Sequence, residues 1–267
     1  MSLLIDQSDG ITTFTINRPA ARNAIDPETA TNLFEGFLEF QADARQKVAI
    51  LTGADGAFCA GYDLKAAARG MNADWAKRHD IPNDWTDPVE NPLPSPMGPA
   101  RLMLSKPVIA AIEGPAVAGG MELALWADVR LIAQSAYFGV FCRRWGVPLI
   151  DGGTVRLPEI VGLGRAQDLI LTGRPVHATE AKDIGLANDV VADGSTLDAA
   201  KRCAHDLMCF PQNCMRADKL HALGPRRRLA EALFNEWQGT LGLLRDAAKG
   251  AARFSAGKGR AGNFHEI

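Results

Sequence analysis

Two short apolar runs, each followed by a glycine-containing loop, limit most strongly which folds this chain can adopt. They cover residues 48–51 and 108–112 and consist of aliphatic side chains without a polar interruption. Runs of this kind are typical of strands that are buried on both faces of a sheet. Alternation over residues 10–17 predicts a further strand, and Asp26 followed by Pro27 predicts a helix start. Strands that alternate with helices indicate an α/β fold with a mostly parallel sheet.

The last part of the chain has a different composition. From about residue 198 it is rich in Ala, Leu, Arg and Glu, and it is interrupted at Pro211 and at Pro225. This composition is typical of helices joined by short turns. We therefore expect a core over residues 1–197 and a helical region over residues 198–267.

Residues 82–99, between the two apolar runs, contain six prolines, with Trp75 and Trp85 nearby. Proline lacks a backbone donor and blocks helices, so this segment is predicted to be a loop. It is either a solvated insertion or, given the two tryptophans, the wall of a pocket.

Charge and termini exclude several classes of partner. The formal net charge is −2 at pH 7, so no basic field draws the chain to nucleic acid or to an anionic membrane. No apolar run approaches the roughly 18 residues of a membrane span, and the first residues lack the pattern of a signal peptide. We expect a cytoplasmic protein with neither nucleic acid nor membrane as a partner.

The five cysteines are scattered and have no CxxC spacing. Cys203, Cys209 and Cys214 come closest together, with His205 between them. This arrangement favours free thiols in a reducing compartment over a metal site, so no metal is expected.

The two apolar runs lead through similar loops, at residues 59–61 and 118–120, into two predicted helices. A helix start exposes unpaired N–H groups and the positive end of the helix dipole, and glycine lets a ligand approach the backbone. Two such starts that converge could hold the oxygen of a polarised carbonyl. Either loop alone is an ordinary strand–helix turn, and neither matches a phosphate-binding fingerprint. Equating the loops position by position pairs the N–H of Tyr62 with that of Met121.

Glu122 lies in the first turn of the second of these helices, between Met121 and Leu123. One interpretation is a carboxylate that stabilises the helix N-terminus. The other is a partly desolvated acid or base, because apolar neighbours raise a carboxyl pKa toward the range that suits proton transfer.

Together these segments resemble the crotonase (enoyl-CoA hydratase/isomerase) family. The likeness covers about residues 11–191 and is carried by residues 58–64, residues 106–124 and shorter motifs at 17–24, 152–157 and 171–186. It implies a crotonase-like core of ββα repeats wound in a spiral, followed by a C-terminal helical region that mediates trimerisation. A homotrimer or a dimer of trimers is the implied assembly.

The resemblance also implies roles for particular residues. It places the oxyanion donors at the backbone N–H groups of Tyr62 and Gly119, in place of the pairing with Met121, and makes Glu122 a catalytic residue. It makes a coenzyme A thioester the substrate and requires no separate cofactor. The residues that it places along the coenzyme A path are Arg22, Ala60, Asp63, Leu64, Phe254 and Lys258. Solvated surface charges are the alternative for Arg22 and Lys258.

This sequence departs from the family at one position. Common hydratases carry a second glutamate where Cys142 stands here. A thiol is a poor substitute, because its reference pKa is about 8.5 and its reach is shorter. Asp151 is the nearest replacement, although a turn residue before Gly152 is the alternative.

Hydration of a trans-2-enoyl-CoA to a 3-hydroxyacyl-CoA, through an oxyanion-stabilised enolate, is the default reaction that the resemblance implies. Two carboxyls share that task, whereas Glu122 alone could serve a double-bond isomerase or another one-base reaction. A non-catalytic acyl-CoA binder is a further alternative, which the retained Glu122 disfavours. Nucleophilic hydrolysis has no support, because no GxSxG elbow is present.

Overall fold

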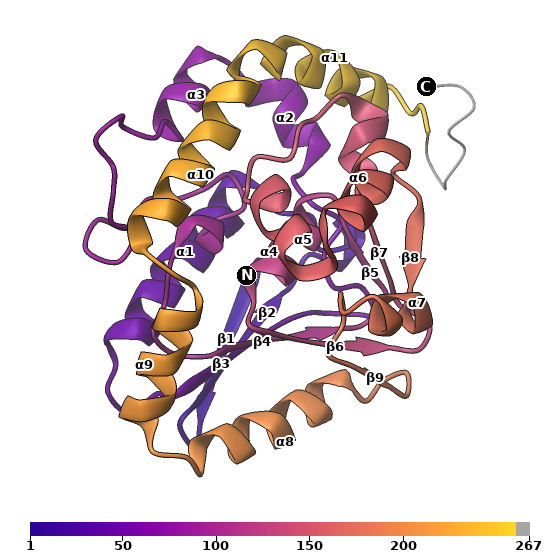
Figure 1. Ribbon diagram of the computed structural model, residues 1–267. Helices are drawn as coiled ribbons and strands as arrows, with labels where there is room; N and C mark the ends of the chain where they lie inside the picture. The colour runs from indigo at the N-terminus through magenta and orange to yellow at the C-terminus, as the bar shows by residue number, and fades with distance from the viewer. Residues whose placement is uncertain (260–267) are drawn as a thin grey trace.

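A six-stranded sheet in the order β1-β2-β3-β4-β6-β9 runs through the centre of the computed structural model, which describes residues 1–259 (Figure 1). β1 pairs antiparallel with β2, and all other neighbours in this sheet are parallel. The two apolar runs of the sequence are the neighbouring strands β3 and β4. The strands are β1 (Leu3–Ser8), β2 (Ile11–Ile16), β3 (Val48–Gly53), β4 (Val108–Ile112), β6 (Val129–Ala133) and β9 (Asp189–Val191).

A second sheet of three strands continues from the first. It contains β5 (Pro115–Val117), β7 (Tyr137–Gly139) and β8 (Pro175–His177), with β5 parallel to β7 and β7 antiparallel to β8. Only two residues separate β4 from β5, and the chain turns there at Gly114, whose φ is +61°. A Cβ at this position would lie 2.1 Å from the Gly56 carbonyl oxygen. The turn between the sheets therefore requires glycine.

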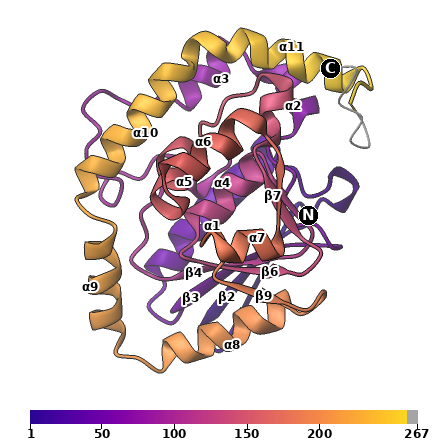
Figure 2. The same ribbon diagram turned by 45° about the vertical axis from the view of Figure 1, so that its right-hand side comes forward.

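Helices cover the large sheet from both sides. α8 (Thr196–Met208) lies along one face, where Ala200 packs with Ile50 and Ile109 (Figure 2). On the opposite face, α1 (Pro27–Ala42) and α4 (Gly119–Trp126) pack on Leu51 and Ala110. Successive residues of a strand point to opposite faces, so β3 and β4 are apolar throughout.

Of the remaining helices, some pack against the core and the last ones in the chain extend away from the large sheet. The boundary expected between residues 197 and 198 falls in the first turn of α8, so the helices that leave the sheet begin with α9. α10 and α11 arch over the end of the molecule where α2 to α6 lie (Figures 1 and 2). The α-helices other than α1, α4 and α8 are α2 (Leu64–Gly70), α3 (Ala73–Arg78), α5 (Gly153–Val161), α6 (Leu163–Thr172), α7 (Ala178–Asp183), α9 (Gln212–Ala222), α10 (Arg226–Thr240) and α11 (Leu244–Ser255). The 3-10 helices are η1 (Pro19–Ala21), η2 (Pro99–Arg101), η3 (Phe141–Trp145) and η4 (Leu241–Leu243).

None of the helices within residues 1–259 combines the length and the apolar character that crossing a lipid bilayer demands.

α11 is seated on η3 by a close backbone contact. A Cβ on Gly250 would lie 1.6 Å from the Trp145 carbonyl oxygen, so the two elements touch where a side chain is missing. The ring of Phe254 meets that of Trp145 edge-on, with 5.2 Å between the centroids. Glycine at position 250 is therefore what lets α11 dock.

We expect Gly250→Ala to displace α11 from η3, because the carbonyl of Trp145 belongs to the backbone and has no room to move aside. The variant should melt at a lower temperature and lose its C-terminal helix to limited proteolysis earlier than the wild type. Gly239→Ala is the matched control, because a Cβ there meets nothing within 4 Å. Equal melting temperatures and cleavage rates for the two variants would contradict the proposed seating.

Candidate active site

A cavity of about 1080 Å³ opens between the two glycine loops, η3 and the end of α11. The residues that the sequence assigned to catalysis all line it, and so do those assigned to the coenzyme A path, apart from Lys258. Pro96 and Met97 of the proline-rich segment also line it, so this segment does supply part of a pocket wall. The predicted residues in the lining are Arg22, Ala60, Tyr62, Asp63, Leu64, Gly119, Glu122, Asp151 and Phe254.

The two glycine loops meet at Gly61 and Gly119. A Cβ on Gly61, whose φ is +92°, would lie 2.9 Å from the Gly119 nitrogen. Ala118, the residue before α4, has φ of 53° and ψ of −127°, an unusual conformation for a residue other than glycine. The backbones therefore approach each other to within a distance that only glycine at position 61 permits.

Both predicted donors are free to serve a ligand. The Ile25 N–H donates to the Gly61 carbonyl and the Asp63 N–H donates to the Ile25 carbonyl, each at 2.8 Å. This pairing turns the intervening Tyr62 N–H away from residue 25. Within residues 1–259, neither the Tyr62 N–H nor the Gly119 N–H has a protein acceptor.

Met121, the partner chosen by equating the two loops, is differently placed. Its N–H donates to the Ala118 carbonyl at 3.0 Å, inside the first turn of α4. This N–H is therefore already used by the helix, whereas the N–H of Gly119 is not.

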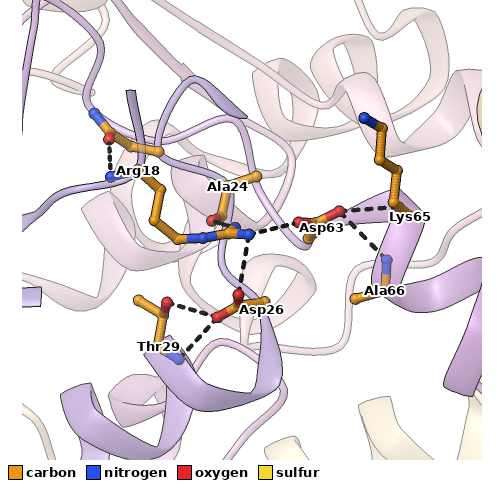
Figure 3. A network of polar contacts seen from close by, with 8 residues as sticks. Arg18, Ala24, Asp26, Thr29, Asp63, Lys65 and Ala66 are labelled. Carbon is orange, nitrogen blue, oxygen red and sulfur yellow. Dashed lines mark hydrogen bonds and ion pairs between the residues drawn. The ribbon is translucent and has the colours of Figure 1, made fainter. Parts of the chain in front are cut away.

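A network of ion pairs fixes the first loop (Figure 3). The Asp63 carboxylate caps α2 by accepting the N–H of Lys65 at 2.9 Å, and it pairs with the Arg18 guanidinium at 2.9 Å. Arg18 also pairs with Asp26, the N-cap of α1, at 3.0 Å. One guanidinium thus joins the caps of two helices, and the Asp63 side chain is committed to holding the loop.

Glu122 is a buried carboxyl that faces the cavity. The residue is 3% exposed, and Oε1 accepts the N–H groups of Asp151 and Gly153, both at 2.9 Å. Burial raises the pKa of Glu122 well above its ordinary value, and the charges of Asp151 and Glu236 raise the pKa further. This environment supports the interpretation of Glu122 as a group for proton transfer.

Asp151 does more than begin a turn. It is 2% exposed and lines the cavity, and its Oδ1 accepts the Met97 N–H at 2.9 Å. Burial raises the pKa of Asp151, while the Ser95 hydroxyl and the Arg101 charge oppose that rise. A second desolvated carboxyl therefore stands in the cavity beside Glu122.

Cys142 also lines the cavity, at the position of the missing glutamate. Burial raises the pKa of its thiol to about 12, and the Glu122 charge adds to the rise. The thiol is thus held neutral at physiological pH and is too weak an acid to replace a carboxyl. Among residues 1–259, no three His, Cys, Asp or Glu side chains are grouped so that they could hold a metal ion.

The family model described as enoyl-CoA hydratase/isomerase matches residues 6–232. This chain belongs to the enoyl-CoA hydratase/isomerase family. The resemblance noted in the sequence is thereby confirmed, and the match extends to residue 232, into the helical end of the chain.

Individual members of the family give the same result. Enoyl-CoA hydratase EchA19 of Mycobacterium tuberculosis is 39% identical over 197 residues, which are 71% of this chain and 68% of the relative. Carnitinyl-CoA dehydratase of Salmonella arizonae is 38% identical over 210 residues, which are 78% and 74% of the two chains.

Solved structures of family members superpose on the whole core. A carnitinyl-CoA dehydratase from Mycobacterium avium has a TM-score of 0.79 at 31% identity, over 95% of this chain and 96% of that one. An enoyl-CoA hydratase from Mycobacterium tuberculosis has a TM-score of 0.75 at 33% identity, over 95% and 99% of the two chains. The predicted crotonase-like α/β fold is confirmed.

A third buried carboxylate of this family member was not predicted from the sequence. Glu236 of α10 is 8% exposed and accepts the Gly152 N–H at 2.7 Å, across 84 residues of sequence. Its only local signal is the spacing of Ala230, Leu233 and Trp237, the buried face of α10, which puts residue 236 beside that face. A glutamate next to a buried stripe is a weak signal for a site residue, since most such glutamates are solvated.

The pKa of Glu122 has a consequence for stability. A carboxyl whose pKa is higher in the folded state than in the unfolded state stabilises the folded protein at low pH. This stabilisation is lost as the pH rises from the ordinary pKa of the group, 4.5, through its raised pKa. We expect Glu122→Gln to remove this loss, because the amide oxygen keeps both N–H partners and carries no charge. The melting temperature of the variant should exceed that of the wild type by a margin that grows from pH 5 to pH 9.

Differential scanning calorimetry across this pH range measures the margin. Glu231→Gln, at an exposed position of α10, is the control and should show a constant difference from the wild type. A margin for Glu122→Gln that shrinks as the pH rises would refute the raised pKa.

Proposed function

We propose that this enzyme adds water to a trans-2-enoyl-CoA to form a 3-hydroxyacyl-CoA, and catalyses the reverse dehydration. The observation that carries the proposal is the meeting of two unpaired N–H groups and two buried carboxyls in one cavity. Relatives named enoyl-CoA hydratase and carnitinyl-CoA dehydratase support a reaction of this type.

The thioester carbonyl oxygen is expected to lie between the N–H groups of Tyr62 and Gly119. Attack of water at the β-carbon pushes the electrons of the double bond onto this oxygen, where negative charge grows. Two donors that are already oriented toward the oxygen stabilise that charge more than bulk water would. The Tyr62 side chain is not needed for this role, because the donor is its backbone.

The two carboxyls divide the proton transfers. Both are desolvated and repel each other as anions, so they share one proton at neutral pH. The stronger rise in pKa at Glu122, and the positive charge of Arg101 near Asp151, favour the proton on Glu122. Asp151 then takes a proton from the attacking water, and Glu122 gives its proton to the α-carbon as the enolate collapses. Transfer of a proton from Asp151 to Glu122 resets the site.

Double-bond isomerisation by Glu122 alone remains the second candidate. A one-base reaction has no use for a second carboxyl, whereas Asp151 stands desolvated in the cavity. Its presence favours hydration. Two carboxyls held in unfavourable burial are likewise difficult to reconcile with a protein that only binds acyl-CoA.

We further propose a lyase that needs no cofactor besides the coenzyme A of its substrate and that works in the cytoplasm as a homotrimer or a dimer of trimers. The coenzyme A moiety would follow Arg22, Ala60, Leu64 and Phe254, which line the cavity together with Asp63.

Incubation with crotonyl-CoA tests the reaction, because hydration removes the absorbance of the conjugated thioester. We expect turnover by the wild type and a loss of about 100- to 10,000-fold in kcat for Glu122→Gln, the range of general acid–base catalysis. Crotonyl-CoA left unchanged by the wild type would exclude hydration. Conversion of a 3-enoyl-CoA to its conjugated isomer by the same preparation would then support the isomerase.

Asp151→Asn and Cys142→Ser show which residue replaces the missing glutamate. The first should lower kcat by about 100-fold or more, since it removes the base for water. The second should leave kcat near that of the wild type, because the thiol is neutral and takes no proton. Steady-state kinetics with crotonyl-CoA measure both, and the reverse order of effects would assign the role to Cys142.

A further inference from the structure

Residues 151–154, the loop that leads into α5 with the first two residues of that helix, are bound by α10 as well as by α4. The Glu236 carboxylate accepts the N–H groups of Gly152 at 2.7 Å and of Thr154 at 2.9 Å. The Thr154 hydroxyl donates to the same carboxylate at 2.6 Å. Three hydrogen bonds to an anion thus join α10 to this loop.

Glu122 accepts the backbone N–H groups of this segment that do not donate to Glu236. The N–H groups of Asp151 and Gly153 donate to Glu122, and those of the intervening and following residues donate to Glu236. Four successive backbone donors therefore alternate between two buried carboxylates. Both carboxylates therefore fix the backbone of this segment. A shift of either one would also move the N–H groups that donate to the other.

Glu236 is placed to act on the substrate only indirectly. It does not line the cavity, whereas Glu122 and Asp151 do. It is 8% exposed and projects from the side of α10 that also carries the buried Leu233 and Trp237. Its contacts with the site therefore pass through the loop.

The charges around the loop reinforce this coupling. Three carboxyls, Glu122, Asp151 and Glu236, are buried beside two guanidinium groups, those of Arg101 and Arg156. Asp80 also acts on Arg101, and Glu159 also acts on Arg156. The charge of Glu236 raises the pKa of Glu122, so Glu236 influences how this carboxyl ionises.

We propose that Glu236 is a positioning residue of the active site, which fixes the loop over residues 151–154 so that Asp151 and Glu122 keep their places at the thioester. The proposal rests on the proposed function for the role of those two carboxyls. It makes α10 part of the catalytic apparatus.

Glu236→Gln tests the proposal. The amide oxygen can still serve Thr154, but the amide N–H₂ faces the Gly152 N–H, donor against donor. We expect kcat to fall by up to about 100-fold, since small displacements of a catalytic group have effects of this size. The KM should stay unchanged, because the predicted coenzyme A path lies on other loops. Glu231→Gln, exposed on the same helix, is the matched control and should behave as the wild type.

The pH profile of kcat separates positioning from mere stability. Loss of the Glu236 charge removes repulsion from Glu122 and lowers the pKa of Glu122. The limb of the kcat profile that reports the ionisation of Glu122 should therefore move to lower pH. A purely structural role would reduce the folded fraction and leave the limb in place. Wild-type kcat and an unmoved limb in folded Glu236→Gln would overturn the proposal.

A melting cycle tests the same coupling without turnover. Melting temperatures of the wild type, Glu122→Gln, Glu236→Gln and the double variant are compared from pH 5 to pH 9. We expect the loss of stability that depends on Glu122 to be smaller, and to be complete at lower pH, when Glu236 is replaced, because the folded-state pKa of Glu122 then lies closer to its ordinary value. Strictly additive effects at every pH would overturn the proposal. Coupling in a protein that hydrates no enoyl-CoA would uphold the contact and reject the proposed function.

Discussion

The approach of Gly61 to Gly119 is the constraint on which the rest of the site depends. β3 and β4 are parallel neighbours, so the loops that follow them leave the sheet at the same edge. β5 then carries the second loop back toward the first, with Cys59 bridged to Ala116. Because position 61 is glycine, its backbone can lie so close to Gly119 that a Cβ would be only 2.9 Å from the Gly119 nitrogen. Sheet order, turn chemistry and the approach of the two loops are therefore aspects of one arrangement.

The carboxyls show how burial sets chemistry. Glu122 and Asp151 belong to different elements, and each is kept in place by backbone N–H groups and removed from water. Desolvation is the largest cause of the raised pKa at both residues. The same burial makes Cys142 inert as an acid. Exchange of the second glutamate for cysteine thus leaves the cavity with two carboxyls, one of them from a different loop.

Much of this site could be predicted from local sequence, because strands buried on both faces and helix starts after glycine have short-range patterns. β3, β4, both loops and Glu122 were found in this way. The choice between Gly119 and Met121 needed either family resemblance or the hydrogen bond inside α4. Glu236 was missed because its partners lie 82 and 84 residues away, and no local pattern distinguishes it from a solvated glutamate.

The bonds from α10 to the loop also bear on the order in which the protein is made. A nascent chain that has emerged as far as α9 already contains the sheet, both glycine loops and the two cavity carboxyls. The N–H groups of Gly152 and Thr154 have no carboxylate to meet until Glu236 leaves the ribosome and α10 docks. The candidate site is then completed only after α10 has been made, when the core that carries it has had time to form.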